Sequence, residues 1–169
     1  MAGLTQIMVD RLSVSTGLPL GALIGDLFAW GVAALYLLIG AFSLRLVGPR
    51  GARDGEPLWF TPDSGRLVIV AVFIAVGEEA VFRGLLQGFL LSLLQPVYAL
   101  FAVNALFALI HARGGLTFAM SAGFFGMIAS VITLASGSLA PAIVMHVGWN
   151  LLIALARRRA SALLSPSEA

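Results

Sequence analysis

The sequence predicts an all-α protein, a polytopic transmembrane helix bundle with about five membrane-spanning helices. Of its 169 residues, 60% are hydrophobic and only 11% are charged, and the mean hydropathy is +1.01. An ordinary soluble domain has about a quarter of its residues charged. The apolar residues also fall into five separate segments, and most arginines stand at the ends of these segments. Both patterns are typical of an integral membrane protein.

The five apolar segments differ in length. A transmembrane helix needs about 20 residues, so the first, second and fourth segments are long enough to span a bilayer. The fifth is slightly short. The third is clearly short, and with Pro96 at its head it is expected to be tilted, broken or partly buried. In chain order the segments are Leu27–Val47, Leu67–Leu94, Val97–Ile110, Leu116–Ala135 and Leu139–Ala156.

Three regions follow from these segments. Residues 1–26 mix apolar and polar side chains and are expected to form an interfacial segment, without the features of a cleavable signal peptide. Residues 27–156 form the predicted transmembrane core, with Asp26 as the N-cap of its first helix. Residues 157–169 form a carboxyl-terminal tail.

The arginines predict the orientation in the cell membrane. With five crossings, eight of the ten fall on one side, Arg11 falls on the other and Arg83 lies within the membrane. An excess of positive charge marks the cytoplasmic side. We therefore expect a multi-pass protein with its carboxyl terminus and the Gly48–Arg66 loop in the cytoplasm.

The remaining composition excludes several functions. The net charge is only +2, and the arginines are placed as topology signals, so we expect no nucleic-acid partner. There is no cysteine, which rules out disulfides, thiolate metal sites and a cysteine nucleophile.

The second segment contains an unusual charged cluster, G-E-E-A-V-F-R, at residues 77–83. A charge at mid-bilayer costs about 2.5–3.5 kcal/mol on insertion scales. Glu79 and Arg83 are four residues apart and can form an ion pair on one helix face. Glu78 lies about 100° around the helix and is left over. Either the cluster is a structural lock between helices, or Glu78 is a catalytic or proton-carrying carboxylate.

The chain has only two histidines, and both lie in or at the end of apolar segments. His111 ends the third segment, and His146 in the fifth is followed four residues later by Asn150 on the same face. A helix histidine in a membrane is often no more than an interhelical hydrogen-bonding residue. Together with Glu78, however, two imidazoles and an amide supply the groups needed to activate water and stabilise an oxyanion.

Three motifs occur in order on successive apolar segments: E-E-x-x-x-R at Glu78–Arg83, F-x-x-x-H at Phe107–His111 and H-x-x-x-N at His146–Asn150. Over residues 67–156 the chain therefore resembles the CAAX-protease and bacteriocin-processing (CPBP, or Abi) family of intramembrane endopeptidases. It is shorter than larger members of that family, with few helices before the first motif.

The resemblance implies a role for each motif residue. Glu78 would be the general base that activates water, and Glu79 and Arg83 would position it. The water and the tetrahedral oxyanion would be held by His111, His146 and Asn150.

Two mechanisms remain open. Glu78, His111 and His146 could hold one divalent metal such as zinc, with water as the fourth ligand. There is no H-E-x-x-H motif, however, and a metal-free mechanism in which the glutamate takes the proton is equally compatible. In either case hydrolysis needs water, and we expect a cavity open to the cytoplasmic side.

The leading functional prediction is an endopeptidase that cleaves a peptide bond near the membrane anchor of a protein or peptide substrate. The alternative is a non-catalytic membrane protein, such as a bacteriocin-immunity factor or an assembly scaffold. A proton-coupled transporter is a third option, disfavoured by the lack of an inverted repeat.

Asn104 and Gln87 are expected to form interhelical hydrogen bonds. Close helix packing is expected at Gly84, Gly88, Gly123 and Gly126.

Overall fold

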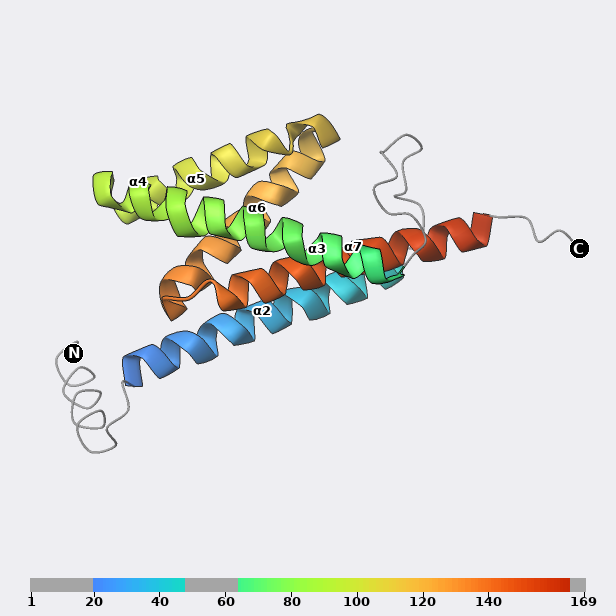
Figure 1. Cartoon of the computed structure of the whole chain (residues 1–169), viewed down its shortest axis with the longest axis horizontal. Helices are drawn as coiled ribbons and strands as arrows, with labels where there is room; N and C mark the ends of the chain where they lie inside the picture. Colours follow the sequence, from blue (N-terminus) through green and yellow to red (C-terminus); the bar gives the residue numbers. More distant parts are fainter. Residues whose placement is uncertain (1–19, 48–63, 165–169) are drawn as a thin grey trace, which may run out of the picture.

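The computed structural model describes residues 20–47 and 64–164, which form a helical bundle (Figure 1). No strand occurs in these two ranges, and the predicted all-α class is confirmed. The elements are α2 (Leu20–Val47), α3 (Ser64–Glu79), the π-helical segment η2 (Ala80–Leu86), α4 (Gln87–Leu93), α5 (Pro96–Ile110), the short 3₁₀ turn η3 (Ala112–Gly114), α6 (Leu116–Ser136) and α7 (Ala140–Leu164).

Each apolar segment of the sequence corresponds to one helical unit. The second segment is covered by α3, η2 and α4, which follow one another without a break from Ser64 to Leu93. The short third segment is the unbroken helix α5, which begins with Pro96 in its first turn. Proline is well tolerated there because the first N–H groups of a helix have no intrahelical partner.

The described helices extend past the predicted core at both ends, and the region boundaries themselves stay predictions. The first helix begins at Leu20, so Asp26 lies inside α2 and its assignment as an N-cap is wrong. The last helix continues through the arginines to Leu164. Residues 1–19 and 165–169, and most of the predicted Gly48–Arg66 loop, lie outside the described residues. The interfacial and cytoplasmic assignments of these regions stay predictions.

The helices run in alternating directions (Figure 1). The end of α2, the start of α3, the α5–α6 connection and the end of α7 lie towards one end of the bundle. The start of α2 and the α4–α5 and α6–α7 connections lie towards the other. Helix α7 packs against α2, α3 and α6, and α6 also packs against α2 and α5. Residues from α3, α5, α6 and α7 can therefore meet at mid-bundle.

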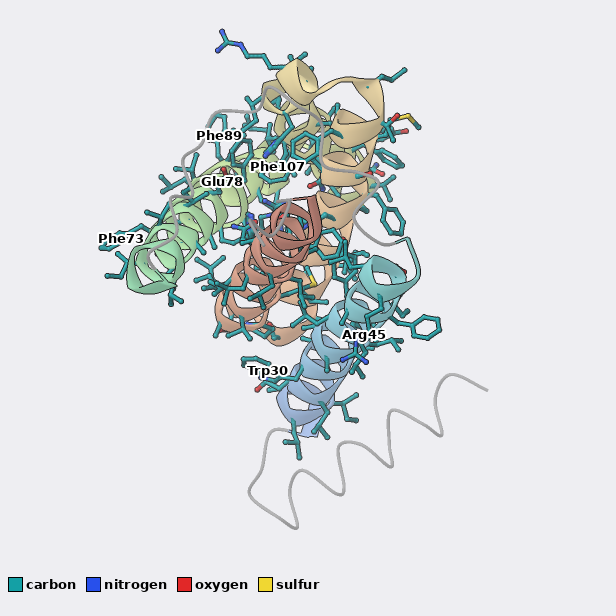
Figure 2. All side chains as sticks on the ribbon, turned by 90° about the vertical axis from the view of Figure 1, so that its right-hand side faces the viewer. Trp30, Arg45, Phe73, Glu78, Phe89 and Phe107 are labelled. Atoms are coloured by element: carbon teal, nitrogen blue, oxygen red, sulfur yellow. The ribbon has the colours of Figure 1, made fainter. Side chains whose placement is uncertain are left out.

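Alanines are frequent inside the bundle, and many large apolar side chains lie on its outer surface. Its buried positions include many alanines, such as Ala29, Ala75 and Ala129, whereas the Phe73 side chain is 74% exposed. Figure 2 shows Phe73 and Phe89 projecting from the outer surface. Two helical stretches, Gly21–Arg45 and Leu116–Ser136, are long and apolar enough to cross a membrane. Small residues at helix interfaces and apolar residues on the outside suit a bundle surrounded by lipid.

The glycine predictions were partly right. A Cβ on Gly123 would lie 3.1 Å from the Cβ of Ala108, and one on Gly126 would meet Asn104, Arg83 and Phe107, so both are close-packing positions. The prediction for Gly88 is wrong, because nothing lies within 4 Å of its Cβ position. At Gly84 a Cβ would make only ordinary contact, 3.5 Å from Leu139.

Candidate active site

The charged cluster lies where α3 passes into the π-helical segment. Glu79 is the last residue of α3, and Arg83 is the buried residue of η2. The Arg83 Nε lies 3.3 Å from Glu79 Oε2, and Nη1 lies 3.5 Å from Oε1. Both side chains are completely shielded from solvent. The ion pair expected from the four-residue spacing is therefore present. Short π-helical segments are frequent at functional sites.

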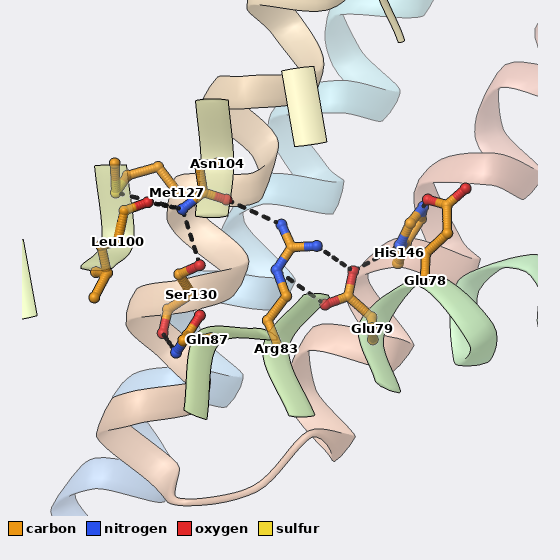
Figure 3. A network of polar contacts seen from close by, with 9 residues as sticks. All are labelled: Glu78, Glu79, Arg83, Gln87, Leu100, Asn104, Met127, Ser130 and His146. Atoms are coloured by element: carbon orange, nitrogen blue, oxygen red, sulfur yellow. Dashed lines mark hydrogen bonds and ion pairs between the residues drawn. The ribbon is translucent and has the colours of Figure 1, made fainter. Parts of the chain in front are cut away.

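His146 from α7 lies between the two adjacent glutamates (Figure 3). Its Nδ1 is 2.7 Å from Glu79 Oε1, and its Nε2 is 3.6 Å from Glu78 Oε2. The four-residue spacing predicted the pairing of Glu79 with Arg83 but not its contact with the histidine. No local signal could have revealed this contact, since the two residues are 67 positions apart. It arises from the packing of α7 against α3.

The partners of the two histidines determine which ring nitrogen carries hydrogen. A carboxylate paired with arginine only accepts hydrogen bonds, so the Nδ1–H of His146 donates to Glu79. The Nδ1 of His111 lies 2.7 Å from the backbone oxygen of Phe107, which is also only an acceptor. Both imidazoles thus use Nδ1 as the donor and keep Nε2 for other partners, a common way of fixing a functional histidine.

The aromatic ring of Phe107 links these groups. The Arg83 guanidinium carbon lies 4.4 Å from the ring centroid, within the range of a cation–π interaction. The rings of His111 and His146 lie 4.6 and 6.3 Å from the same centroid. The F-x-x-x-H motif therefore supplies the histidine together with the apolar surface against which the arginine and both imidazoles pack.

Behind Arg83, a chain of hydrogen bonds continues into α5 and α6 (Figure 3). Arg83 Nη2 donates to Asn104 Oδ1 at 3.3 Å, and Asn104 Nδ2 donates to Ser130 Oγ at 3.0 Å. Gln87 Nε2 donates to the Ser130 backbone oxygen at 3.4 Å. The expected interhelical hydrogen bonds of Asn104 and Gln87 are present. The contact between Asn104 and the arginine was not predicted from the sequence.

The remaining predicted residues are more accessible. The Glu78 side chain is 27% exposed, although its Oε2 is buried and accepts no hydrogen bond from any described residue. His111, at the end of α5, and Asn150, one turn after His146 on α7, are half-buried. Within the described ranges no hydrogen bond joins Glu78, His111 and Asn150 to one another. The structure thus brings Glu78, Glu79, Arg83 and His146 into direct contact, and His111 joins them through Phe107.

The donor groups do not fit a three-ligand metal site. Among residues 20–47 and 64–164, no three His, Cys, Asp or Glu side chains are grouped so that they could hold a metal ion. Of the three candidate ligands, only Glu78 and His146 approach each other closely.

Comparison with known proteins matches residues 60–152, more than half of the 169-residue chain, to the family described as type II CAAX prenyl endopeptidase Rce1-like. The matched stretch contains all three motifs. No curated protein and no solved structure matches the chain significantly. The resemblance seen in the sequence is confirmed, and this chain belongs to the Rce1-like family of type II CAAX prenyl endopeptidases.

Proposed function

We propose that the protein is an intramembrane endopeptidase in which Glu78 activates the attacking water. The observation that carries this proposal is the different environment of two adjacent carboxylates. Glu79 is fully shielded and engaged by Arg83 and His146, whereas Glu78 is partly exposed and its Oε2 faces only the Nε2 of His146. A general base must be free to take a proton from a bound water. Only Glu78 meets this requirement.

In the proposed hydrolysis, Glu78 carries one proton from the attacking water to the leaving nitrogen. Glu78 removes a proton from water, and the water oxygen forms a bond to the carbonyl carbon of the scissile peptide. The carbonyl electron pair moves to its oxygen and gives a tetrahedral oxyanion. Collapse of this intermediate breaks the C–N bond, and Glu78 returns the proton to the leaving nitrogen. No metal ion is needed for any of these steps.

The other motif residues would hold the reacting groups. Family membership supports roles for His111, His146 and Asn150 around the reacting groups. With hydrogen on Nδ1, each imidazole offers Nε2 as an acceptor for a water proton, and the Asn150 amide can donate to the oxyanion. His146 is held by Glu79 at Nδ1, which leaves Nε2 beside Glu78. Neither His111 nor Asn150 is hydrogen-bonded to Glu78 without substrate; such contacts often form only in the substrate complex.

The substrate would be a protein or peptide anchored in the same membrane. The family description names prenylated CAAX chains, and a bundle with an apolar outer surface can meet a lipid-anchored tail within the bilayer. We propose that all five helical units span the membrane. The cytoplasmic end would be the one at which α3 begins and α7 ends, because Arg45 and Arg113 also lie there. Water would enter the site from that side.

The activity test uses the full-length protein in detergent or vesicles. A farnesylated peptide ending in a C-a-a-X sequence is compared with the same peptide without lipid, and wild type is compared with Glu78→Gln. We expect cleavage of the lipidated peptide by wild type only. No cleavage by wild type, or equal cleavage by Glu78→Gln, would contradict the proposal, and the second result would favour a structural role for the cluster.

Topology is tested with single cysteines in this cysteine-free chain. Gln95→Cys lies in the α4–α5 connection, and Ser64→Cys lies at the start of α3, at the other end of the bundle. With an impermeant reagent on intact cells, we expect labelling at position 95 and no labelling at position 64 until the cells are permeabilised. The reverse pattern would overturn the proposed orientation.

A further inference from the structure

Asn104 occupies the point where three helical units meet around Arg83. It lies on α5, is almost fully buried, and its neighbours in the hydrogen-bond chain come from η2 and α6. None of the three family motifs includes this residue. The proposed hydrolysis does not involve Asn104 either, so its buried amide has no role in the function proposed so far.

The hydrogen bonds of Asn104 determine how its amide is oriented. Nδ2 has two hydrogens, and they go to Ser130 Oγ at 3.0 Å and to the Leu100 backbone oxygen at 2.8 Å. Oδ1 is therefore the atom that faces Arg83 Nη2. The opposite orientation would place an NH₂ group against the guanidinium, where two donors would face each other. Ser130 and Leu100 thus make Asn104 an acceptor for the arginine.

Gly126 on α6 provides the space for this contact. A Cβ added at Gly126 would collide with Asn104 Oδ1 and would lie 2.6 Å from Arg83 Nη2. Any side chain at position 126 would therefore enter the gap occupied by the hydrogen bond. The sequence places glycine where the arginine and the amide must approach each other.

We propose that Asn104 is a positioning residue that keeps the Arg83 guanidinium on Glu79 and away from Glu78. Arg83 has five N–H donors on a flexible stem, and two carboxylates lie on adjacent residues. Asn104 holds Nη2 on the side facing α5, while Nε and Nη1 face Glu79. Without that acceptor, the guanidinium is free to turn towards Glu78, where it would neutralise the base and release Glu79 from its fixed position.

A displacement of the Arg83 guanidinium also affects His146, because both residues bond to Glu79. Glu79 Oε1 receives both the Arg83 Nη1 hydrogen bond and the Nδ1 hydrogen bond of His146. Once the guanidinium leaves Glu79, that carboxylate is no longer fixed, and the ring hydrogen of His146 can lie on Nε2, beside Glu78, as well as on Nδ1. This inference rests on the proposed function for its kinetic consequence, but the state of His146 can be measured without any turnover.

Two variants remove the contact from different helices, and each has a matched control. Asn104→Leu keeps the approximate side-chain size and deletes the acceptor. Gly126→Ala leaves both hydrogen-bonding groups unchanged and fills the gap between them. Gln87→Leu removes another buried amide, which bonds to α6 but not to Arg83. Gly88→Ala is the same glycine substitution at a position with open space around it.

The first readout is the ¹⁵N spectrum of the imidazoles in protein labelled with ¹⁵N-histidine and purified through a histidine-free tag. The chain has only two histidines, and a His111→Gln sample assigns the signals. We expect a single Nδ1-protonated pattern for His146 in wild type, Gln87→Leu and Gly88→Ala. Asn104→Leu and Gly126→Ala should show a changed or mixed protonation pattern. A wild-type pattern in both contact variants would overturn the proposal.

The second readout is the split between kcat and KM for the lipidated peptide. In both contact variants we expect kcat to fall by about 10- to 100-fold, the size of effect that misplaced catalytic groups produce, with KM within about 2-fold of wild type. Both controls should retain wild-type kcat. A rise in KM with unchanged kcat, or equal losses of kcat in the controls, would mean that Asn104 is merely structural.

Failure of this inference can be told apart from failure of the proposed function. An inactive wild type contradicts the endopeptidase assignment, while the histidine spectra still decide whether Asn104 positions the ion pair. Should Asn104→Leu fail to accumulate, Gly126→Ala and the milder Ser130→Ala, which removes the hydroxyl partner of Asn104, provide the same comparison. Unchanged spectra in these two variants would also contradict the proposal.

Discussion

The polar groups of this protein form two halves that meet at His146. The buried half consists of Glu79, Arg83, Asn104 and Ser130. The open half consists of Glu78, His111 and Asn150. In the buried half every side chain is shielded from solvent. Glu79 pairs with Arg83 one turn along the chain, Arg83 bonds to Asn104, and Asn104 bonds to Ser130. In the open half the side chains are partly exposed, and no hydrogen bond joins them within the described residues.

This difference indicates that the buried half has a structural role and the open half a reactive one. Polar groups in a low-dielectric interior must be satisfied, and a satisfied network holds its members in one geometry. Groups that react must keep free hydrogen-bonding capacity, even though unsatisfied polar atoms are costly. Glu78 Oε2 is such an atom. Glu79 Oε2 and Arg83 Nε make no hydrogen bond either, but they face each other at 3.3 Å as an ion pair. The two halves therefore predict different consequences of mutation: loss of stability in one and loss of turnover in the other.

The largest expected loss of stability comes from Glu79→Ala. This change leaves the Arg83 guanidinium buried without its carboxylate and frees the Nδ1 of His146. Breaking a buried ion pair by removing one partner costs about 3–5 kcal/mol. Thermal unfolding in detergent and abundance in membranes measure the loss. The double variant E79L/R83M leaves no buried charge at the pair and should recover part of it. No recovery would contradict the ion-pair explanation.

An intermediate effect is expected from Phe107→Leu, because the ring contacts both halves. The substitution removes the cation–π contact with Arg83 and the surface on which His111 packs. We expect a loss of about 1–2 kcal/mol in the free energy of unfolding, combining the cation–π contribution with reduced packing. Phe101→Leu is the control, since Phe101 lies on the same helix and the residue is 64% exposed. Equal losses in both variants would show that the Phe107 contacts are unimportant.

The smallest change in stability is expected from Asn150→Ala in the open half. Asn150 is half-buried and has no hydrogen bond to another described side chain, so the free energy of unfolding should change by less than about 0.5 kcal/mol. Its loss should still lower kcat by about 10²- to 10³-fold, the usual effect of removing one oxyanion donor. Cleavage kinetics and thermal unfolding of the same sample test both statements. A large loss of stability with normal kcat would place Asn150 in the supporting half.

Much of the fold could be predicted because each helical unit contains one continuous apolar run of the sequence. Apolar runs identified all five helical units, and the short third run is indeed a separate helix, α5. The helix ends were less predictable. Asp26 resembles a helix start in the sequence, yet α2 begins six residues earlier. An aspartate inside a helix costs only about 0.7 kcal/mol relative to alanine, so a single acidic residue does not show where a helix begins.

The candidate site was predictable where its contacts are local. The Glu79–Arg83 pair follows from a four-residue spacing, and Asn104 stands out as an amide in an apolar helix. Contacts between distant helices could not be predicted, because they depend on how each helix is rotated. The Glu79–His146 hydrogen bond and the gap at Gly126 both belong to this class. Gly88 is a second example, because close packing was predicted for it as for Gly126, but it faces open space.

The central claim is that two adjacent glutamates have different tasks, and one paired measurement tests it most directly. Glu78→Gln and Glu79→Gln are each measured for unfolding temperature and for cleavage of the lipidated peptide under the same conditions. We predict that Glu78→Gln unfolds at or above the wild-type temperature and has no detectable turnover, because it loses the base and no engaged charge. Glu79→Gln should unfold at a clearly lower temperature, because Arg83 loses its charged partner. Equal destabilisation by both substitutions, or normal turnover in Glu78→Gln, would contradict the account.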